Sequence, residues 1–114
     1  MMDTVVQLLL GALCAFYLLW VAYLAVMNLK RAAQARTIGT TAWLLGLPLV
    51  VVAYVLDVVV NWVVMTFALL EWPREWTVTA RLKRHCGTPT WRGAVARFVC
   101  HQLLDTFDPS GRHC

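Results

Sequence analysis

The sequence predicts an all-α membrane protein, a two-transmembrane-helix hairpin with a small, mainly helical, basic C-terminal tail at the membrane interface. Three observations predict this class. The 114 residues are 61% hydrophobic and 14% charged, whereas soluble domains average about 45–50% and about 25%. Two apolar runs are each long enough to cross a bilayer. Seven of the ten Lys and Arg residues follow the second run, so the chain changes character abruptly there.

The first predicted span covers residues 5–28, after a short N-terminus of residues 1–4. Gln7 is the only strongly polar residue between Val5 and Met27, and this run would extend roughly 34 Å as a helix. A cleaved signal peptide fits less well, because residues 1–4 carry no Lys or Arg and the run exceeds the usual length of about 7–15 residues. We therefore expect a retained transmembrane helix.

The second predicted span covers residues 42–71 and follows a basic loop at residues 29–41. It is longer than a bilayer requires, so we expect it to tilt or to project past the hydrocarbon. Pro48 lies about one turn in, where it is expected to kink the helix or to mark its true start.

Tryptophans near the span ends predict two interfacial belts, because indole rings favour the headgroup level. Packing of some of these rings inside the helix bundle is the alternative. The predicted anchors are Trp20, Trp43, Trp72, Trp76 and Trp91.

The tail, residues 72–114, divides at a predicted break over residues 86–89. Residues 75–85 alternate apolar and polar side chains as a strand does, but a lone strand is unstable. The segment therefore either pairs with another chain or is helical. Thr90 can cap an amphipathic helix over about residues 90–106, whose apolar stripe suits either the membrane interface or the core of the tail.

The positive-inside rule gives conflicting predictions of orientation. Three basic residues favour a cytoplasmic loop, whereas seven favour a cytoplasmic tail. Three tail cysteines cannot all pair within one chain, which favours a reducing compartment. We expect the N-terminus and the tail on the cytoplasmic side.

Asp57 is the sharpest functional candidate, because it lies at the midpoint of the second span. An ionised carboxylate at the bilayer centre costs at least about 2.5–3.5 kcal/mol. Asn61 and Tyr54 share its helical face, and Tyr17 of the first span is expected near its depth. Holding an oligomer or the hairpin together is the favoured role, and lining a pore or relaying protons is the alternative.

Three adjacent Cys/His pairs make the tail a candidate zinc site, since zinc takes four such ligands. The usual CxxC or HxxxH spacing is absent, so a solvated histidine, a buried thiol and a disulfide are competing interpretations. No cofactor beyond a structural zinc is expected. The candidate ligands are His85, Cys86, Cys100, His101, His113 and Cys114.

Basic tail residues are candidates for binding anionic headgroups or a protein partner, since each nearby cation contributes about 1 kcal/mol at a lipid surface. Nucleic acid is not expected, because acidic residues are interspersed among them. The candidates are Arg74, Arg81, Lys83, Arg84, Arg92 and Arg97.

The stretch Pro73–His85, the pair Trp91-Arg92 and the stretch Leu103–Cys114 resemble small uncharacterised inner-membrane proteins of tailed phages and prophages. The resemblance covers only the tail. It implies a bacterial inner-membrane location and a phage-related role, and it transfers no catalytic or binding residue.

These features predict a non-enzymatic membrane protein that binds or modulates a membrane or host-envelope partner, as in superinfection exclusion. We expect it to act as a homo-oligomer or with a host membrane protein. A holin-like pore-forming oligomer is the first alternative, because two spans and an intramembrane Asp57 are compatible with it. A membrane-anchored metal-binding adaptor is the second.

Overall fold

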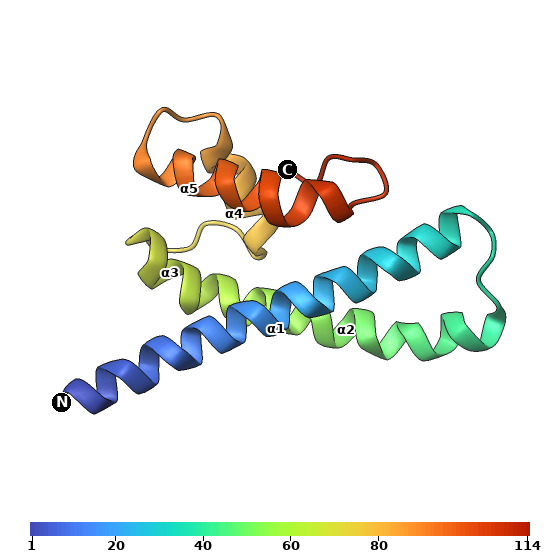
Figure 1. Ribbon diagram of the computed structural model, residues 1–114, viewed down its shortest axis with the longest axis horizontal. Coiled ribbons are helices and arrows are strands. Elements are labelled where there is room, and N and C mark those ends of the chain that lie inside the picture. The colour runs from blue at the N-terminus through green and yellow to red at the C-terminus, as the bar shows by residue number, and fades with distance from the viewer.

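The computed structural model describes residues 1–114 and contains helices and no strands, which confirms the all-α class. Helices α1 and α2 form an antiparallel hairpin, and α4 to η2 lie beside it as a tail domain, here residues 72–114 (Figure 1). Two segments, Met2–Gln34 and Thr40–Leu69, are long and apolar enough to cross a membrane. The elements are α1 (Met2–Gln34), α2 (Thr40–Trp62), α3 (Val64–Leu69), α4 (Val78–Cys86), α5 (Trp91–Val99), the π-helix η1 (Cys100–Leu104) and the 3-10 helix η2 (Asp105–Phe107).

The hairpin differs from its predicted form at the loop and at Pro48. Because α1 continues to Gln34, the connection shortens from the predicted residues 29–41 to residues 35–39. Helix α2 begins at Thr40 and passes through Pro48, so the proline marks neither a start nor an end. Gly46 brings the two helices close, because a Cβ there would lie 2.9 Å from a methyl carbon of Leu29.

The second apolar run breaks at Val63 instead, between α2 and α3. The Thr66 hydroxyl donates to the Trp62 carbonyl at 2.7 Å, and such back-bonding from Thr bends helices. Leu70, with φ of 53°, ends α3 in the left-handed conformation.

The tail begins with two short helices that are each capped by a threonine. The Thr77 hydroxyl oxygen accepts from the Ala80 amide, and the Thr90 oxygen accepts from the Gly93 amide, both at 3.2 Å. The segment 75–85 is thus largely helical rather than a strand, because a threonine cap starts α4 at Val78. The predicted helix over about 90–106 corresponds to α5, η1 and η2 in succession.

The core lies in the seam between the hairpin and the tail domain. The hairpin side and the tail domain both contribute to one cluster of buried side chains, and partly buried residues of α1 pack against this cluster. The tail is therefore docked on the hairpin by a shared core. The buried members are Val60, Met65, Leu69, Val78, Leu82, Ala96, Cys100 and Leu104.

Candidate functional site

Asp57 caps a tail helix from within the hairpin. Its Oδ1 accepts a hydrogen bond from the backbone amide of Val78 at 2.8 Å, and Val78 is the first residue of α4. The carboxylate thus satisfies an amide that has no partner within the helix and complements the positive end of the helix dipole. Thr77 accepts from the Ala80 amide in the same first turn, so α4 has one cap from the hairpin and one from the tail.

Asn61 makes a second link on the same face of α2. Its side-chain amide donates to the Glu75 carbonyl at 2.6 Å, and its side chain is fully buried. Tyr54 and Tyr17, predicted to act with Asp57, are exposed and make no side-chain hydrogen bond. The structure therefore brings Asp57 and Asn61 together in the seam and leaves the two tyrosines outside it.

Two aromatic residues of α1 hold the other end of the tail. The Trp20 indole donates to the Leu103 carbonyl at 2.9 Å, and the Tyr23 hydroxyl donates to the Leu104 carbonyl at 2.5 Å. Trp20 therefore packs between the hairpin and the tail domain, where Phe107 lies edge-on against its ring. The other predicted anchors are exposed: Trp43, Trp72, Trp76 and Trp91.

A cluster of ion pairs fills the space between α3 and α4. Arg84 pairs with Glu71 at 2.8 Å and with Glu75, and His85 Nε2 lies 2.6 Å from a Glu71 oxygen. Burial raises the pKa of Glu71, but hydrogen bonds from His85 and Arg84 outweigh it and hold that pKa below its usual range. Arg81 has no exposed surface, and burial lowers its pKa.

Most of the predicted basic contact residues bond inside the chain. Besides Arg81 and Arg84, Arg92 donates to the last carbonyl of α3 at 2.6 Å and Arg97 to the last carbonyl of α4 at 2.9 Å. Arg92 and Arg97 thus bond to carbonyl groups at helix C-termini, which have no partner within their own helix. Arg74 and Lys83 remain exposed and unpaired, and so does Arg112, which the prediction did not include.

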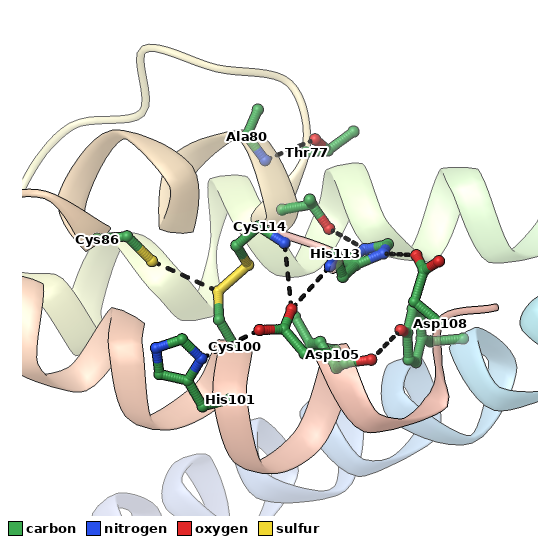
Figure 2. The surroundings of a disulfide bond; sticks show 12 residues. Thr77, Ala80, Cys86, Cys100, His101, Asp105, Asp108, His113 and Cys114 are labelled. Atoms are coloured by element: carbon green, nitrogen blue, oxygen red, sulfur yellow. Dashed lines mark hydrogen bonds and ion pairs between the residues drawn. A yellow bond between two sulfur atoms is a disulfide. The ribbon is translucent and has the colours of Figure 1, made fainter. Parts of the chain in front are cut away.

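The predicted metal ligands divide into three clustered cysteines and three separated histidines. Cys100 and Cys114 form a disulfide, and the Cys86 Sγ lies 3.6 Å from the Cys100 Sγ (Figure 2). The three sulfur atoms lie within 4.8 Å of one another. Burial raises the pKa of the Cys86 thiol, and Arg97 only partly opposes this.

Each histidine ring lies within hydrogen-bond distance of a carboxylate. His85 contacts Glu71, His101 Nδ1 lies 3.0 Å from Asp105, and His113 Nδ1 lies 2.9 Å from Asp108. Adjacent side chains project in different directions, so no Cys/His pair converges on one point.

The C-terminal segment is held against the hairpin through two carboxylates. Asp105 accepts from the His113 amide at 2.7 Å, and Lys30 of α1 lies 3.6 Å from Asp108. Burial raises the pKa of both carboxyls, but hydrogen bonds from His113 and its neighbours hold these pKa values below the ordinary range. The His113 ring also packs on Tyr23.

Comparison with protein-family models, with curated proteins and with solved structures gives no match for this chain. The functional argument therefore rests on the seam, the exposed cations of the tail and the cysteine cluster.

Proposed function

We propose that this chain is a non-enzymatic protein of the bacterial inner membrane, with a phage-related role, that acts by binding a membrane or host-envelope partner. The observation that carries the proposal is the use of Asp57 inside the chain, as the cap of α4. A carboxylate bonded in this way is unavailable to a neighbouring copy or to an ion path. The tail domain is thereby a fixed, basic surface held on a membrane anchor.

The holin-like alternative requires polar side chains that line a path between copies. Over residues 8–26 of α1 and 42–62 of α2 the exposed side chains are apolar or aromatic, and the two strongly polar residues in the middle of the second span bond to the tail. Binding through the tail is better supported. Its free surface carries the cations Arg74, Lys83 and Arg112 and also exposes Trp72 and Trp76.

Expression in a bacterial host separates the two functions. We expect tolerated expression, no potassium leakage, and resistance to phage infection that is lost in the variant Arg74→Glu/Lys83→Glu. The control variant Arg36→Glu, in the hairpin loop, should retain resistance. Timed, lethal potassium leakage would overturn the proposal in favour of the pore.

A membrane-anchored metal-binding adaptor is the second candidate function, favoured by the cysteine cluster. Tetrahedral zinc with Zn–S bonds of about 2.3 Å separates its sulfur ligands by about 3.8 Å, close to the 3.6 Å between Cys86 and Cys100. The cluster must first be reduced: a dithiol supplies two electrons and two protons to open the Cys100–Cys114 bond. Three thiols then bind one divalent ion and release three protons.

Cadmium titration of the reduced protein in nanodiscs tests this candidate. We expect one Cd²⁺ per chain, seen by its ultraviolet thiolate-to-metal charge-transfer band, and loss of this band in Cys86→Ser. Cys14→Ser is the matched control, because Cys14 is an exposed thiol of α1 outside the cluster. A band of equal strength in Cys86→Ser, or no band in the native sequence, would exclude the site.

A further inference from the structure

The tail domain bonds to both ends of the hairpin. At the loop end of α1, Lys30 lies 3.6 Å from Asp108, and Arg31 donates to the Phe107 carbonyl at 3.3 Å. At the opposite end, Arg92 donates to the last carbonyl of α3 at 2.6 Å. Helices α5 to η2 run alongside the hairpin between these points (Figure 1). If the hairpin crossed a bilayer, the two ends would lie at opposite membrane surfaces.

A docked tail would then have to cross the hydrocarbon with the hairpin, and its surface does not suit that position. Lys83, His101 and Gln102 are exposed, and exposed cations and polar groups are costly in hydrocarbon. The connections at residues 70–77 and 87–90 are irregular backbone, and such backbone does not occur exposed to lipid within the hydrocarbon region. Only α1 and the α2–α3 segment are apolar enough to cross a membrane.

Over residues 8–26 of α1 and 42–62 of α2 every exposed side chain is apolar or aromatic, whereas the tail also exposes charged and polar side chains. Helix α2 exposes the valines Val51, Val52, Val55 and Val59, and α1 exposes its apolar N-terminal half. The molecule thus has a lipid-compatible layer and a polar layer side by side. It measures 50 × 34 × 22 Å, and one leaflet of hydrocarbon, about 15 Å deep, accommodates a layer of helices about 10 Å across.

The distribution of basic residues points the same way. In a spanning hairpin, the loop and the tail lie on opposite sides, so either Arg36 with its basic neighbours or the more basic tail violates the positive-inside rule. If both ends of the hairpin lie at one surface, both basic segments are cytoplasmic and the conflict disappears.

We therefore propose that the hairpin inserts into the inner leaflet without crossing the membrane, with its loop, its N-terminus and the tail domain all on the cytoplasmic side. The partner of the apolar hairpin surface is the acyl region of one leaflet. The exposed cations Arg74, Lys83 and Arg112 lie where anionic headgroups can neutralise them. This arrangement keeps every seam hydrogen bond intact and places no exposed cation in hydrocarbon.

The side of the loop relative to the N-terminus distinguishes this arrangement from a spanning hairpin, because a spanning hairpin places its loop on the side opposite to the N-terminus and the tail. A single cysteine is introduced as Ala35→Cys, an exposed loop position, with all four native cysteines replaced by serine. We expect a membrane-impermeant maleimide to label it in inverted vesicles and not in intact spheroplasts. Met2→Cys in the same background is the reference for the cytoplasmic face. Labelling of either cysteine in spheroplasts, or of Ala35→Cys at neither face, would overturn the proposal.

The native protein gives a second readout that does not depend on the serine substitutions. Trypsin can cut after Arg36 in the loop and after Arg74 in the tail. We expect both cuts in inverted vesicles and neither in spheroplasts. A spanning hairpin would instead be cut at one of the two sites in spheroplasts and at the other in inverted vesicles. Neither result depends on the partner or on metal binding, so this inference and the proposed function fail separately.

Discussion

In α1, a helix of 33 residues, Met27 is the only buried residue, whereas the nine-residue α4 buries Val78, Arg81, Leu82 and His85. The hairpin helices have no side-chain cap, but α4 and α5 are each capped by a threonine. Long helices without caps or buried faces are stable in lipid, where backbone groups must bond within the helix. The short tail helices depend on particular side chains. The same kind of substitution should therefore have different consequences in the two regions.

The largest contrast is expected for truncation of a leucine. Leu82→Ala removes a fully buried side chain from the shared core, which should lower the free energy of unfolding of the tail by about 2–5 kcal/mol. Leu47→Ala, at an exposed position of α2, should leave the tail unchanged. Pulse proteolysis in denaturant, in nanodiscs, measures both. Equal effects would contradict the distinction between the regions.

Glycine-to-alanine changes sharpen the comparison. A Cβ at Gly93 would lie 2.1 Å from the Thr88 carbonyl oxygen, which is backbone, so Gly93→Ala should destabilise the tail by about 1–3 kcal/mol. At Gly46 the nearest atom is the end of the flexible Leu29 side chain, so Gly46→Ala should cost less than about 1 kcal/mol. Gly87→Ala is the tail control, because nothing lies within 4 Å. Thermal unfolding followed by circular dichroism should rank the three variants in this order.

Loss of the Asp57 cap tests the link between the regions. Asp57→Ala should weaken docking by about 0.5–2 kcal/mol, the usual contribution of a helix cap, while Asp57→Asn retains an acceptor oxygen and should lose less. The rate of tryptic cleavage after the fully buried Arg81, in detergent, reports release of the tail. If Asp57→Ala is cleaved no faster than the native chain, the carboxylate does not contribute to docking.

The smallest effect near neutral pH is expected for protonation of two tail carboxylates. Acidification should release the C-terminal segment, but only at low pH. The pKa values of Asp105 and Asp108 are lower in the folded chain than in the unfolded chain. Their ionised forms therefore stabilise docking above the ordinary value of about 3.9, and this contribution is lost as the pH falls through the folded-state values. Exchange of the His113 amide should be constant from about pH 5 to 8, after correction for intrinsic rates, and accelerate below about pH 4. Acceleration near neutrality would contradict this assignment.

The helices of the hairpin follow from apolar length alone, and the start of α5 follows from Thr90. The alternation of apolar and polar side chains over residues 75–85 was compatible with a strand as well as a helix. The helix forms because Thr77 caps its first turn. The pairing of Asp57 with the Val78 amide depends on a contact between segments distant in the chain. No pattern within either segment specifies it.

The roles of the arginines were equally hidden. Arg81 and Arg97 belong to a run of basic residues that suggests a surface, but one is fully buried and the other bonds the end of α4. The sequence gives the number of basic residues but not the carbonyl or carboxylate groups to which each of them bonds in the fold. The convergence of Cys86 with the disulfide likewise required the fold, because α4 and η1 bring their sulfur atoms together.

The central claim is that Asp57 docks the tail on the hairpin in lipid, and the Val78 amide reports it most directly. Hydrogen exchange should be measured at this amide in nanodiscs, in the native chain and in Asp57→Ala. We expect Val78 to be protected in the native chain and to exchange faster in the variant, while the Ala80 amide, bonded to Thr77, keeps its protection in both. Equal exchange at Val78 in the two chains would contradict the docked tail.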